Sequence, residues 1–360
     1  MLTPYVLFEK SDWYKNEIQF VRDYLKPGMH FLDIGASFGV YALMAAKKVG
    51  ESGLVTAFEN DIIARNFLEL SIKTNNFEHL SLIRKTVSDT DGVANWVSRS
   101  IPELSSFDEN GDEQVESVRL DSWWEEGAIS AVDFIKINVN GFEHKVLQAA
   151  TSLLKETEPI LLISTTPENY SEIRITLESL DYQLFEYLPG SGILTSFVDT
   201  ELIVGRNLIG LTPARLNELK EEGWILNEEL TFEKPESDRW KSFFERLTWS
   251  GPMMFGWEYV ADAQENESYF QALNFLIAAE EINSSDDISR SKKNQVTSYL
   301  IESVHRLIDL YNSGSANISV AFTLARGLLA LGKRDQAVHI MQRVIDETAF
   351  GQKNMLTPFP

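Results

Sequence analysis

The chain contains no cysteine, and it has few basic residues for the number of acidic ones. Without cysteine it can form neither disulfide bonds nor thiolate metal sites, and a cysteine nucleophile is excluded. Of its 360 residues, 32 are Lys or Arg and 54 are Asp or Glu, so the formal net charge is −22 at pH 7. A surface this acidic repels phosphate backbones and anionic headgroups. We therefore expect neither nucleic acid nor a membrane surface as the main partner.

Long hydrophobic runs and paired histidines are also missing. No apolar run approaches the roughly 20 residues that a membrane-spanning helix needs. The N-terminal sequence MLTPYVLFEKSDWYK contains acids and lacks the uninterrupted apolar core of a signal peptide. The five histidines are scattered, without the spacing of a metal site. These absences predict a cytoplasmic protein that binds no metal and does not insert into a membrane.

The most informative segment that is present is Phe31–Asn60, FLDIGASFGVYALMAAKKVGESGLVTAFEN. A short apolar run reaches the acid Asp33 and is followed by the turn Gly35-Ala36-Ser37-Phe38-Gly39. A segment with helical spacing comes next, and a second apolar run then ends at Glu59. A strand, a glycine turn, a helix and a strand ending in an acid form a βαβ nucleotide-binding unit.

Each part of this unit has a physical role in holding a nucleoside. Gly35 and Gly39 let the backbone turn tightly and let a ligand approach without meeting a Cβ atom. The helix directs unpaired N–H groups towards the turn, and Glu59 can accept hydrogen bonds from two ribose hydroxyls. The spacing D-x-G-x-x-x-G differs from G-x-G-x-x-G and favours S-adenosylmethionine (SAM) over NAD. A glycine turn of any other α/β protein is the alternative interpretation.

The next part of the chain alternates strands and helices at a spacing typical of a doubly wound α/β sheet. After a helix at Asp12–Leu25, seven strands are expected, of which the last is antiparallel. Their cores are Phe31–Asp33, Leu54–Phe58, Leu80–Lys85, Val132–Val139, Pro159–Ser164, Tyr182–Tyr187 and Glu201–Gly205. A polar insertion, Asp89–Val115, separates the third strand from a further strand at Val115–Leu120. This pattern predicts a first domain over residues 1–206.

Beyond residue 206 the pattern changes. Residues 207–260 are rich in tryptophan and read as a connector or lid, whereas residues 261–360 look helical throughout. Two predicted helices, Ile318–Leu331 and Asp335–Glu347, are joined by Gly332-Lys333-Arg334, and the string ALGKRDQAVHIMQRVID across this junction resembles the second half of a tetratricopeptide repeat. Because such solenoids need about three repeats to bury a core, we expect a helical bundle docked on the first domain.

A third stretch, Asp133–Leu147 (DFIKINVNGFEHKVL), completes a set of motifs together with FLDIGASFGVY, AFEN and TVSDTDG. In this order the motifs resemble those of the FkbM family of SAM-dependent methyltransferases, over roughly residues 25–205. The resemblance implies the class I methyltransferase fold, SAM as the cofactor and O-methylation, often of sugar or polyketide hydroxyls.

The resemblance also implies roles for individual positions. The turn Gly35–Gly39, preceded by Asp33, would hold the methionine end of SAM, and Glu59 followed by Asn60 would hold the ribose. Ser88 and Asp89 would lie beside the adenine, and Asn138 would face the transferring methyl group.

The chain departs from the family pattern at several of these places. Where the family usually reads I-K-I-D-V-E-G, this chain has Asn138 and Asn140 in place of the two acids. The fifth strand ends in Ser164, where an acid is frequent, Ser37 replaces an asparagine and Asn60 replaces a proline. An amide can orient a hydroxyl but cannot accept its proton as a carboxylate does.

Two residues of the following helix are candidates for the missing acid–base chemistry. His144 is the nearest possible base, and its alternative interpretation is an exposed helix residue. Glu143 matches a glutamate of the family, and its alternative is a first-turn acid that stabilises the helix dipole. The sequence leaves both pairs of interpretations open.

Three hypotheses of function follow. The first is a SAM-dependent O-methyltransferase acting on a hydroxyl of a sugar or glycan. The second is a decayed methyltransferase fold that binds a protein or glycan partner through its helical C-terminal region, motivated by Asn138, Asn140 and Ser164. The third, an NAD-dependent oxidoreductase, is disfavoured by the turn spacing. The aromatic segment Trp249–Trp257 (WSGPMMFGW) is either a platform for a sugar ring or interdomain packing.

Overall fold

The structure is a computed structural model that describes residues 3, 16–99, 105–107, 111–129, 131–197, 206–227, 232–246, 266–284, 288–313 and 318–349. The chain divides into two compact units. The first comprises Met1–Tyr187 and Thr195–Glu218, and the second comprises Leu188–Leu194 and Leu219–Pro360. Each is described separately below.

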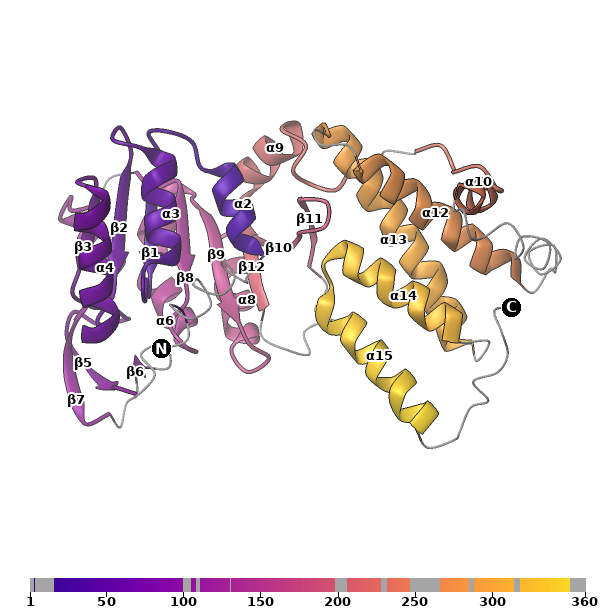
Figure 1. Cartoon of the computed structure of the whole chain (residues 1–360). Coiled ribbons are helices and arrows are strands. Elements are labelled where there is room, and N and C mark those ends of the chain that lie inside the picture. Colours follow the sequence, from indigo (N-terminus) through magenta and orange to yellow (C-terminus); the bar gives the residue numbers. More distant parts are fainter. Residues whose placement is uncertain are drawn as a thin grey trace. The chain divides into compact units, whose positions relative to one another are not determined.

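The first unit is built on a sheet of eight strands in the order β11-β10-β12-β9-β8-β1-β2-β3 (Figure 1). The strands are β1 His30–Ile34, β2 Leu54–Phe58, β3 Leu80–Ile83, β8 Phe134–Ile137, β9 Ile160–Thr165, β10 Gln183–Leu188, β11 Ile193–Ser196 and β12 Arg206–Leu211. Neighbours from β3 to β9 are parallel, whereas β12 is antiparallel to both β9 and β10. This is the doubly wound sheet with an antiparallel strand that the sequence predicts.

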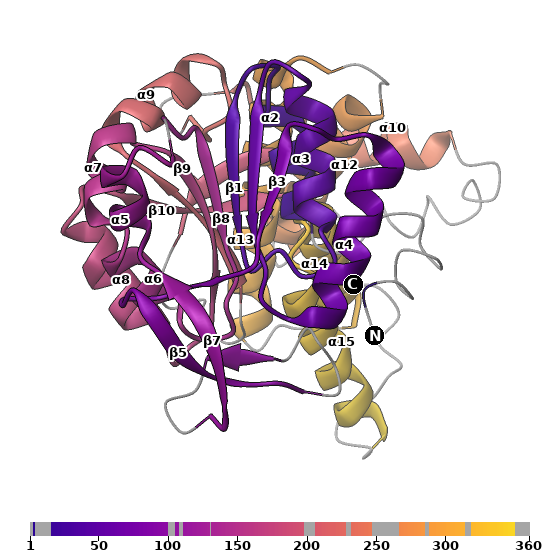
Figure 2. The same cartoon turned by 90° about the vertical axis from the view of Figure 1, so that its left-hand side faces the viewer.

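Helices cover both faces of this sheet, as a largely parallel sheet requires. Figure 2 shows α2, α3 and α4 on one face and α5 to α9 on the other. Their bounds are α2 Glu17–Tyr24, α3 Val40–Val49, α4 Ile62–Asn75, α5 Leu120–Glu125, α6 Glu143–Gln148, α7 Thr151–Thr157, α8 Tyr170–Glu178 and α9 Pro213–Glu221. The central strands β1 and β8 are therefore buried along their whole length.

The polar insertion forms a second, smaller sheet in the order β4-β7-β5-β6. Its strands are β4 Thr86–Val87, β5 Gly92–Val97, β6 Ser106–Phe107 and β7 Glu113–Val118. β7 begins and ends two residues earlier than the predicted strand Val115–Leu120, because Leu120 opens helix α5. This small sheet brings Trp96 and Ser105, which are far from the glycine turn in sequence, close to that turn.

The second unit is helical in its described part. It contains α10 Arg239–Glu245, α12 Glu267–Asn283, α13 Arg290–Asn312, α14 Ile318–Leu331 and α15 Arg334–Ala349. The last four pack successively on one another around a common apolar core that includes Trp240. Gly332, at φ 83°, ends α14 and lets α15 begin two residues later. The predicted helical pair is confirmed, and the tetratricopeptide resemblance stays a prediction.

The remaining differences from the sequence-based expectations concern boundaries. The predicted strand Glu201–Gly205 lies outside the described residues, and the antiparallel strand is β12, with β11 as an additional strand at the edge. The first compact unit continues beyond residue 206 to Glu218, because β12 pairs with β9 and is followed by α9. The proposed platform Trp249–Trp257 lies outside the described residues.

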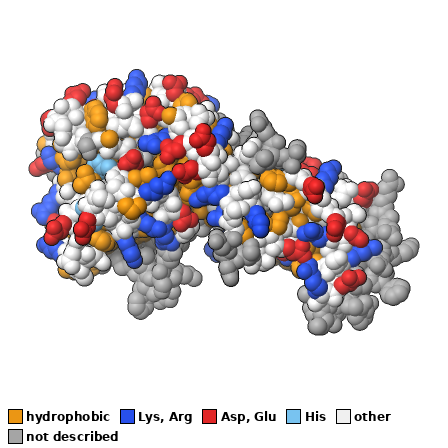
Figure 3. All heavy atoms as spheres, turned by 90° about the horizontal axis from the view of Figure 1, so that it is seen from above, with side chains coloured by type: hydrophobic (Ala, Val, Ile, Leu, Met, Phe, Trp, Pro, Cys, Tyr) orange, Lys and Arg blue, Asp and Glu red, His pale blue; other side chains and the backbone are white. Residues whose placement is uncertain are grey.

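The described surface mixes both signs of charge. On the face in Figure 3, acidic and basic side chains are interspersed over each unit. No helix in the described ranges is both long and apolar enough to cross a membrane. Within the same ranges, no cluster of three His, Asp or Glu side chains is arranged to hold a metal ion.

Candidate active site

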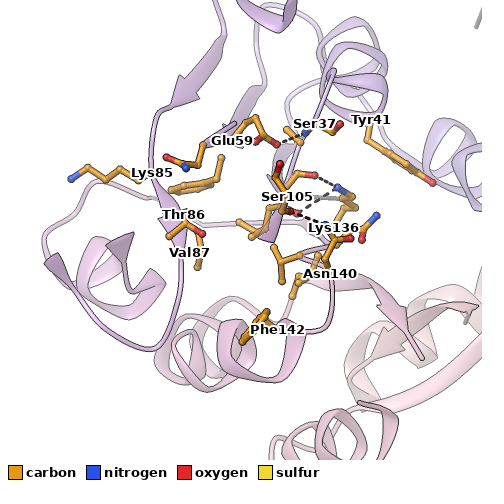
Figure 4. Close-up of a pocket in the computed structure, with 18 of the residues that line it drawn as sticks. Ser37, Tyr41, Glu59, Lys85, Thr86, Val87, Ser105, Lys136, Asn140 and Phe142 are labelled. Atoms are coloured by element: carbon orange, nitrogen blue, oxygen red, sulfur yellow. Dashed lines mark hydrogen bonds between the residues drawn. The ribbon is translucent and has the colours of Figure 1, made fainter. Parts of the chain in front are cut away.

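A cavity of about 310 Å³ lies in the first unit, where the parallel strands β1, β2 and β8 end. The residues that directly follow these three strands, Gly35, Glu59 and Asn138, all line it. Figure 4 shows Glu59 among the lining side chains. Ligands of open α/β sheets bind in this position, outside the carboxyl ends of the strands. The volume falls at the lower end of the range of small-molecule sites.

The glycine turn after β1 is shaped by a close backbone contact. Gly35 has φ 74°, and a Cβ atom at this position would lie 2.1 Å from the backbone oxygen of Asn138. Gly39 has φ 84°, and its Cβ would meet the side chain of Leu68 at 2.3 Å. Both positions therefore require glycine. Ser37 also has a positive φ, of 50°, and its buried hydroxyl has no hydrogen-bond partner among the described residues.

Glu59 joins this turn to the helix that follows β2. One carboxylate oxygen accepts a hydrogen bond from the backbone N–H of Ser37 at 2.6 Å, and the other accepts from that of Asp61 at 2.7 Å. Asp61 in turn caps α4 by accepting from the N–H groups of Ile63 and Ala64. Burial raises the pKa of Glu59, and the two N–H donors oppose that rise.

A buried ion pair lies beneath the turn. Lys136 on β8 places its Nζ atom 2.9 Å from Oδ1 of Asp33 on β1, and both side chains are almost completely buried. The same ammonium donates to the backbone oxygen of Gly35 at 2.6 Å and lies 3.4 Å from that of Ile34. Asp33 is thus held under the turn without lining the cavity, whereas Lys136 lines it.

The two amides that replace family acids are both on the cavity side of β8. Asn138 follows the strand directly, and its backbone N–H donates to Ile34 at 3.1 Å. Asn140 has φ 53° and donates its side-chain N–H to the backbone oxygen of Ser105 at 2.9 Å. The hydroxyl of Ser105 donates to Asp61 at 3.2 Å. Hydrogen bonds therefore run from Asn140 through Ser105 and Asp61 to Glu59 and the glycine turn.

Glu143 and His144 do not line the cavity. The buried carboxylate of Glu143 accepts from the backbone N–H groups of Val139 at 2.9 Å and Gly141 at 3.0 Å, and from the amide of Asn169 at 2.7 Å. It thereby fixes the loop between β8 and α6. Burial raises its pKa.

His144 faces helix α8 instead of the cavity. Its Nε2 atom lies 3.3 Å from the carboxylate of Glu172, whose side chain is exposed. The structure therefore places this candidate base on the outer side of α6, as a helix residue paired with a neighbouring helix.

Of the two residues predicted to lie beside the adenine, one lines the cavity and the other does not. Ser88 lines the cavity, although its hydroxyl is bonded to the hydroxyl of Ser117 and to the backbone oxygen of Thr90. Asp89 does not line the cavity, and its carboxylate lies 4.0 Å from Nζ of Lys145. The ring of Trp96 lines this end of the cavity, and its buried Nε1 has no hydrogen-bond partner in the described part of the chain.

Most of the predicted cofactor residues thus meet at one cavity. Those that line it are Gly35, Ala36, Ser37, Phe38, Glu59, Asn60, Ser88 and Asn138. The predicted cofactor residues that do not are Asp33, Gly39 and Asp89, and the predicted catalytic residues Glu143 and His144 do not line it either. Asp33 and Gly39 are nevertheless next to the turn, one as the partner of Lys136 and the other as the residue before α3.

Comparison with known protein families agrees with this geometry. Residues 33–184, which contain the glycine turn, Glu59 and the whole of β8, match the model of the methyltransferase FkbM domain. This part of the chain is an FkbM domain of the SAM-dependent methyltransferases. The chain matches no curated protein.

The chain is also similar to solved structures, two of which follow. A methyltransferase FkbM from Methylobacillus flagellatus is 17% identical, with a TM-score of 0.38, over 55% of this chain and 48% of that chain. A SAM-dependent O-methyltransferase from Thermotoga maritima is 16% identical, with a TM-score of 0.35, over 57% of this chain and 69% of that chain. The chain thus spans about half the length of the first.

The FkbM domain implies SAM, and the cavity offers groups that suit it. Ser37 Oγ, in the turn, and Trp96 Nε1, on β5, are buried polar atoms that lack partners within the described ranges, and both residues line the cavity. Glu59 also lines it, with a carboxylate able to accept from two hydroxyls. Gly35, whose backbone packs against the Asn138 oxygen, presents no side-chain atom to the cavity.

Sequence reasoning missed several lining residues of the FkbM domain. The most important are Tyr41, Trp96, Ser105, Lys136, Lys145 and Asn207. Tyr41, Lys136 and Lys145 belong to the quoted motifs, and Lys136 carried the additional signal of a charged residue in an otherwise apolar strand. Trp96 and Ser105 come from the small sheet, whose path over the cavity no local pattern indicates.

Proposed function

We propose that the protein is a SAM-dependent O-methyltransferase that acts on a hydroxyl group, and that its acceptor is a sugar or a glycan intermediate. The observation that carries this proposal is the convergence of the glycine turn, Glu59 and Asn138 on one cavity in an FkbM domain. The acceptor class rests on the resemblance to the family, because a fold does not determine a substrate.

The cavity residues suggest how the cofactor would be held. Val87, Ser88 and Trp96 would surround the adenine, Glu59 would accept from the ribose hydroxyls, and the turn from Gly35 to Ser37 would face the methionine part. SAM supplies a methyl group on a positively charged sulfur. The protein's task is to place an acceptor oxygen in line with that group.

On the acceptor side, Asn138 would orient the hydroxyl. Its amide can hold a hydroxyl through both its oxygen and its N–H groups, but it cannot take the proton. Among the described lining residues there is no histidine, and Glu59 is the one carboxylate. We propose that the proton leaves towards solvent past Asn140, which is exposed.

The alternative is a decayed enzyme that acts through a protein or glycan partner of its helical unit. Asn138, Asn140 and Ser164 motivate it. One observation favours an altered active site instead. The Asn140 amide donates to the backbone oxygen of Ser105, and an ionised acid at this position has no proton to donate. The amide therefore has a use that the family acid would not serve.

Calorimetric titration with SAM and S-adenosylhomocysteine tests the proposal. The variant Glu59→Gln keeps the size of the side chain and removes its charge, and Glu51→Gln, in an exposed turn after α3, is the matched control. We expect micromolar binding by the wild type and the control, and binding weaker by about tenfold or more in Glu59→Gln, since hydrogen bonds to a charged group are the stronger kind. Absence of binding at millimolar ligand would overturn the proposal.

A further inference from the structure

Lys136 is a buried cation at the centre of the sheet, and the proposed reaction has no step for it. It lies on β8 between the parallel strands β1 and β9, a position that is otherwise apolar. A lysine is rarely buried unless it is paired. Asp33 supplies one partner, but a lone ion pair in a core often contributes little stability. A further role would explain why the charge is there.

The ammonium of Lys136 reaches the cavity next to the glycine turn. Its Nζ atom contacts Asp33 at 2.9 Å and the Gly35 oxygen at 2.6 Å, whereas the Ile34 oxygen at 3.4 Å is a long third contact. An ammonium group has three donors, so the third can turn to a stronger acceptor. The ring of Tyr41 lies 5.8 Å from Nζ on the same side.

Lys136 and the adenine end are on opposite sides of the cavity. In Figure 4 the side chains of Lys136 and Tyr41 are on one side, and Lys85, Thr86 and Val87 are on the other, with Glu59 between them. A SAM molecule with its adenine near Val87 and its ribose at Glu59 would direct its amino-acid end towards Lys136. That end carries a carboxylate.

We propose that Lys136 binds the methionine carboxylate of SAM and of S-adenosylhomocysteine. This inference rests on the proposed function, because it assumes that the cavity holds SAM. The other two lysines of the lining are placed differently. Lys85 pairs with Glu116 at 3.3 Å, and Lys145 lies over the ring of Phe142 with Asp89 at 4.0 Å. Lys136 is the one that contacts the turn.

A purely structural role for Lys136 makes a different prediction. If the lysine only neutralises Asp33 and holds the Gly35 oxygen, its removal weakens every ligand of the cavity to the same degree. If it binds the carboxylate, its removal weakens only ligands that carry that group. The comparison of two ligands therefore separates the two roles.

The first experiment needs no variant. The affinities of the wild-type protein for S-adenosylhomocysteine and for its decarboxylated analogue are measured by calorimetry. The two ligands share the nucleoside, the sulfur and the amine. We expect the carboxylate to improve the affinity about tenfold or more, as charge-assisted hydrogen bonds do in partly buried sites. Equal affinities would overturn the inference while leaving the proposed function intact.

The second experiment assigns the effect to Lys136. Lys136→Met alone would leave Asp33 buried without a partner, so the double variant Asp33→Asn/Lys136→Met removes both charges together, and Lys136→Arg keeps the charge. We expect the ligand difference to fall below about twofold in the double variant and to persist in Lys136→Arg and in the control Lys47→Met, at an exposed position of α3 outside the cavity lining. A difference that persists in the double variant would show that another group holds the carboxylate.

The binding results would differ if the proposed function itself were wrong. In that case neither ligand would bind the wild type, and 5′-methylthioadenosine, which lacks the amino-acid part, would not bind either. If 5′-methylthioadenosine binds and the carboxylate does not improve affinity, the role of Lys136 is overturned and the proposed function is left intact. If the double variant does not fold, Lys136→Gln, which removes the charge and keeps a side-chain N–H donor for Asp33, assigns the effect instead, because the ligand difference should fall there as well.

Discussion

The two walls of the cavity use their polar side chains in opposite ways. On the wall formed by β1 and β2, the carboxylate of Glu59 accepts hydrogen bonds from two backbone N–H groups. On the wall formed by β8, the amide of Asn140 donates to a backbone oxygen of Ser105. The neighbouring backbone group decides which side chain fits. An acid suits a place surrounded by N–H groups, and an amide suits a place that faces a carbonyl.

The largest effect is expected where the two walls meet. Gly35→Ala would place a Cβ atom 2.1 Å from the Asn138 oxygen, so the walls would have to move apart. We expect a loss of about 3 kcal/mol or more in the free energy of unfolding, together with loss of S-adenosylhomocysteine binding. Urea unfolding and calorimetry measure the two quantities.

Gly127→Ala is the matched control for this change. Gly127 has φ 73°, close to that of Gly35, but its Cβ would meet nothing within 4 Å. It should show only the cost of the left-handed backbone, about 1 to 2 kcal/mol. Equal costs at both positions would mean that the walls can separate freely.

The acid of the first wall should make stability and binding respond oppositely to pH. Burial raises the folded-state pKa of Glu59 above its ordinary value. The stability linked to this group is therefore present below the ordinary glutamate pKa and is lost as pH rises through the raised one. The ionised form is the better acceptor for ribose hydroxyls, so ligand affinity should rise over the same interval.

Glu59→Gln should remove both trends. Urea unfolding and calorimetry between pH 4.5 and 8 compare the variant with the wild type. If the stability of the wild type, relative to Glu59→Gln, increases with pH, then Glu59 is not the group responsible and the interpretation of this wall is wrong.

The amide of the second wall should resist replacement by an acid of the same size. Asn140→Asp keeps the shape and tolerates the positive φ, but the ionised side chain cannot donate to Ser105. At pH 7.5 we expect S-adenosylhomocysteine to bind about three- to tenfold more weakly, because one hydrogen bond of the chain that reaches Glu59 is lost. As the pH falls towards the ordinary aspartate pKa of about 3.9, the affinity relative to the wild type should begin to recover, because the protonated acid can donate.

Asn76→Asp provides the comparison for this variant, since Asn76 has nearly the same φ, 54°, at the end of α4 and lies outside the cavity lining. A gain of affinity or of turnover in Asn140→Asp would instead indicate decay from an acidic ancestor.

The smallest effect is expected at His144, behind the second wall. His144→Gln removes its contact with the exposed Glu172, which should change the free energy of unfolding by less than about 1 kcal/mol. Ligand affinity should stay within about twofold, because the residue does not line the cavity. With a methyl acceptor in hand, a fall in kcat of about a hundredfold would identify His144 as a base after all.

The sequence predicted the first wall better than the second for a physical reason. The glycine turn, its helix and Glu59 are contiguous along 30 residues, so spacing alone places them together. Periodicity also predicted the first six strands of the sheet to within about two residues, and the predicted helices Ile318–Leu331 and Asp335–Glu347 correspond to α14 and α15.

What the sequence could not predict depends on contacts between distant segments. Ser105 reaches the cavity through a small sheet and bonds to Asn140 and Asp61, which are 35 and 44 positions away. The sequence also could not predict the direction in which a side chain points. Glu143 and His144 are adjacent in the motif, yet one is buried under the β8 loop and the other faces α8.

The carboxylate of Glu59 gives the protein an internal reporter. It holds the amide protons of Ser37 and Asp61, which are 24 positions apart in sequence but share one acceptor group. When the Glu59 side chain moves away, both hydrogen bonds break at once. The two amide protons should therefore exchange with deuterium at matched rates, unlike the amides on either side. A ligand that engages Glu59 would slow both together, and amide exchange would therefore register occupancy of the cavity even when no methyl acceptor is known.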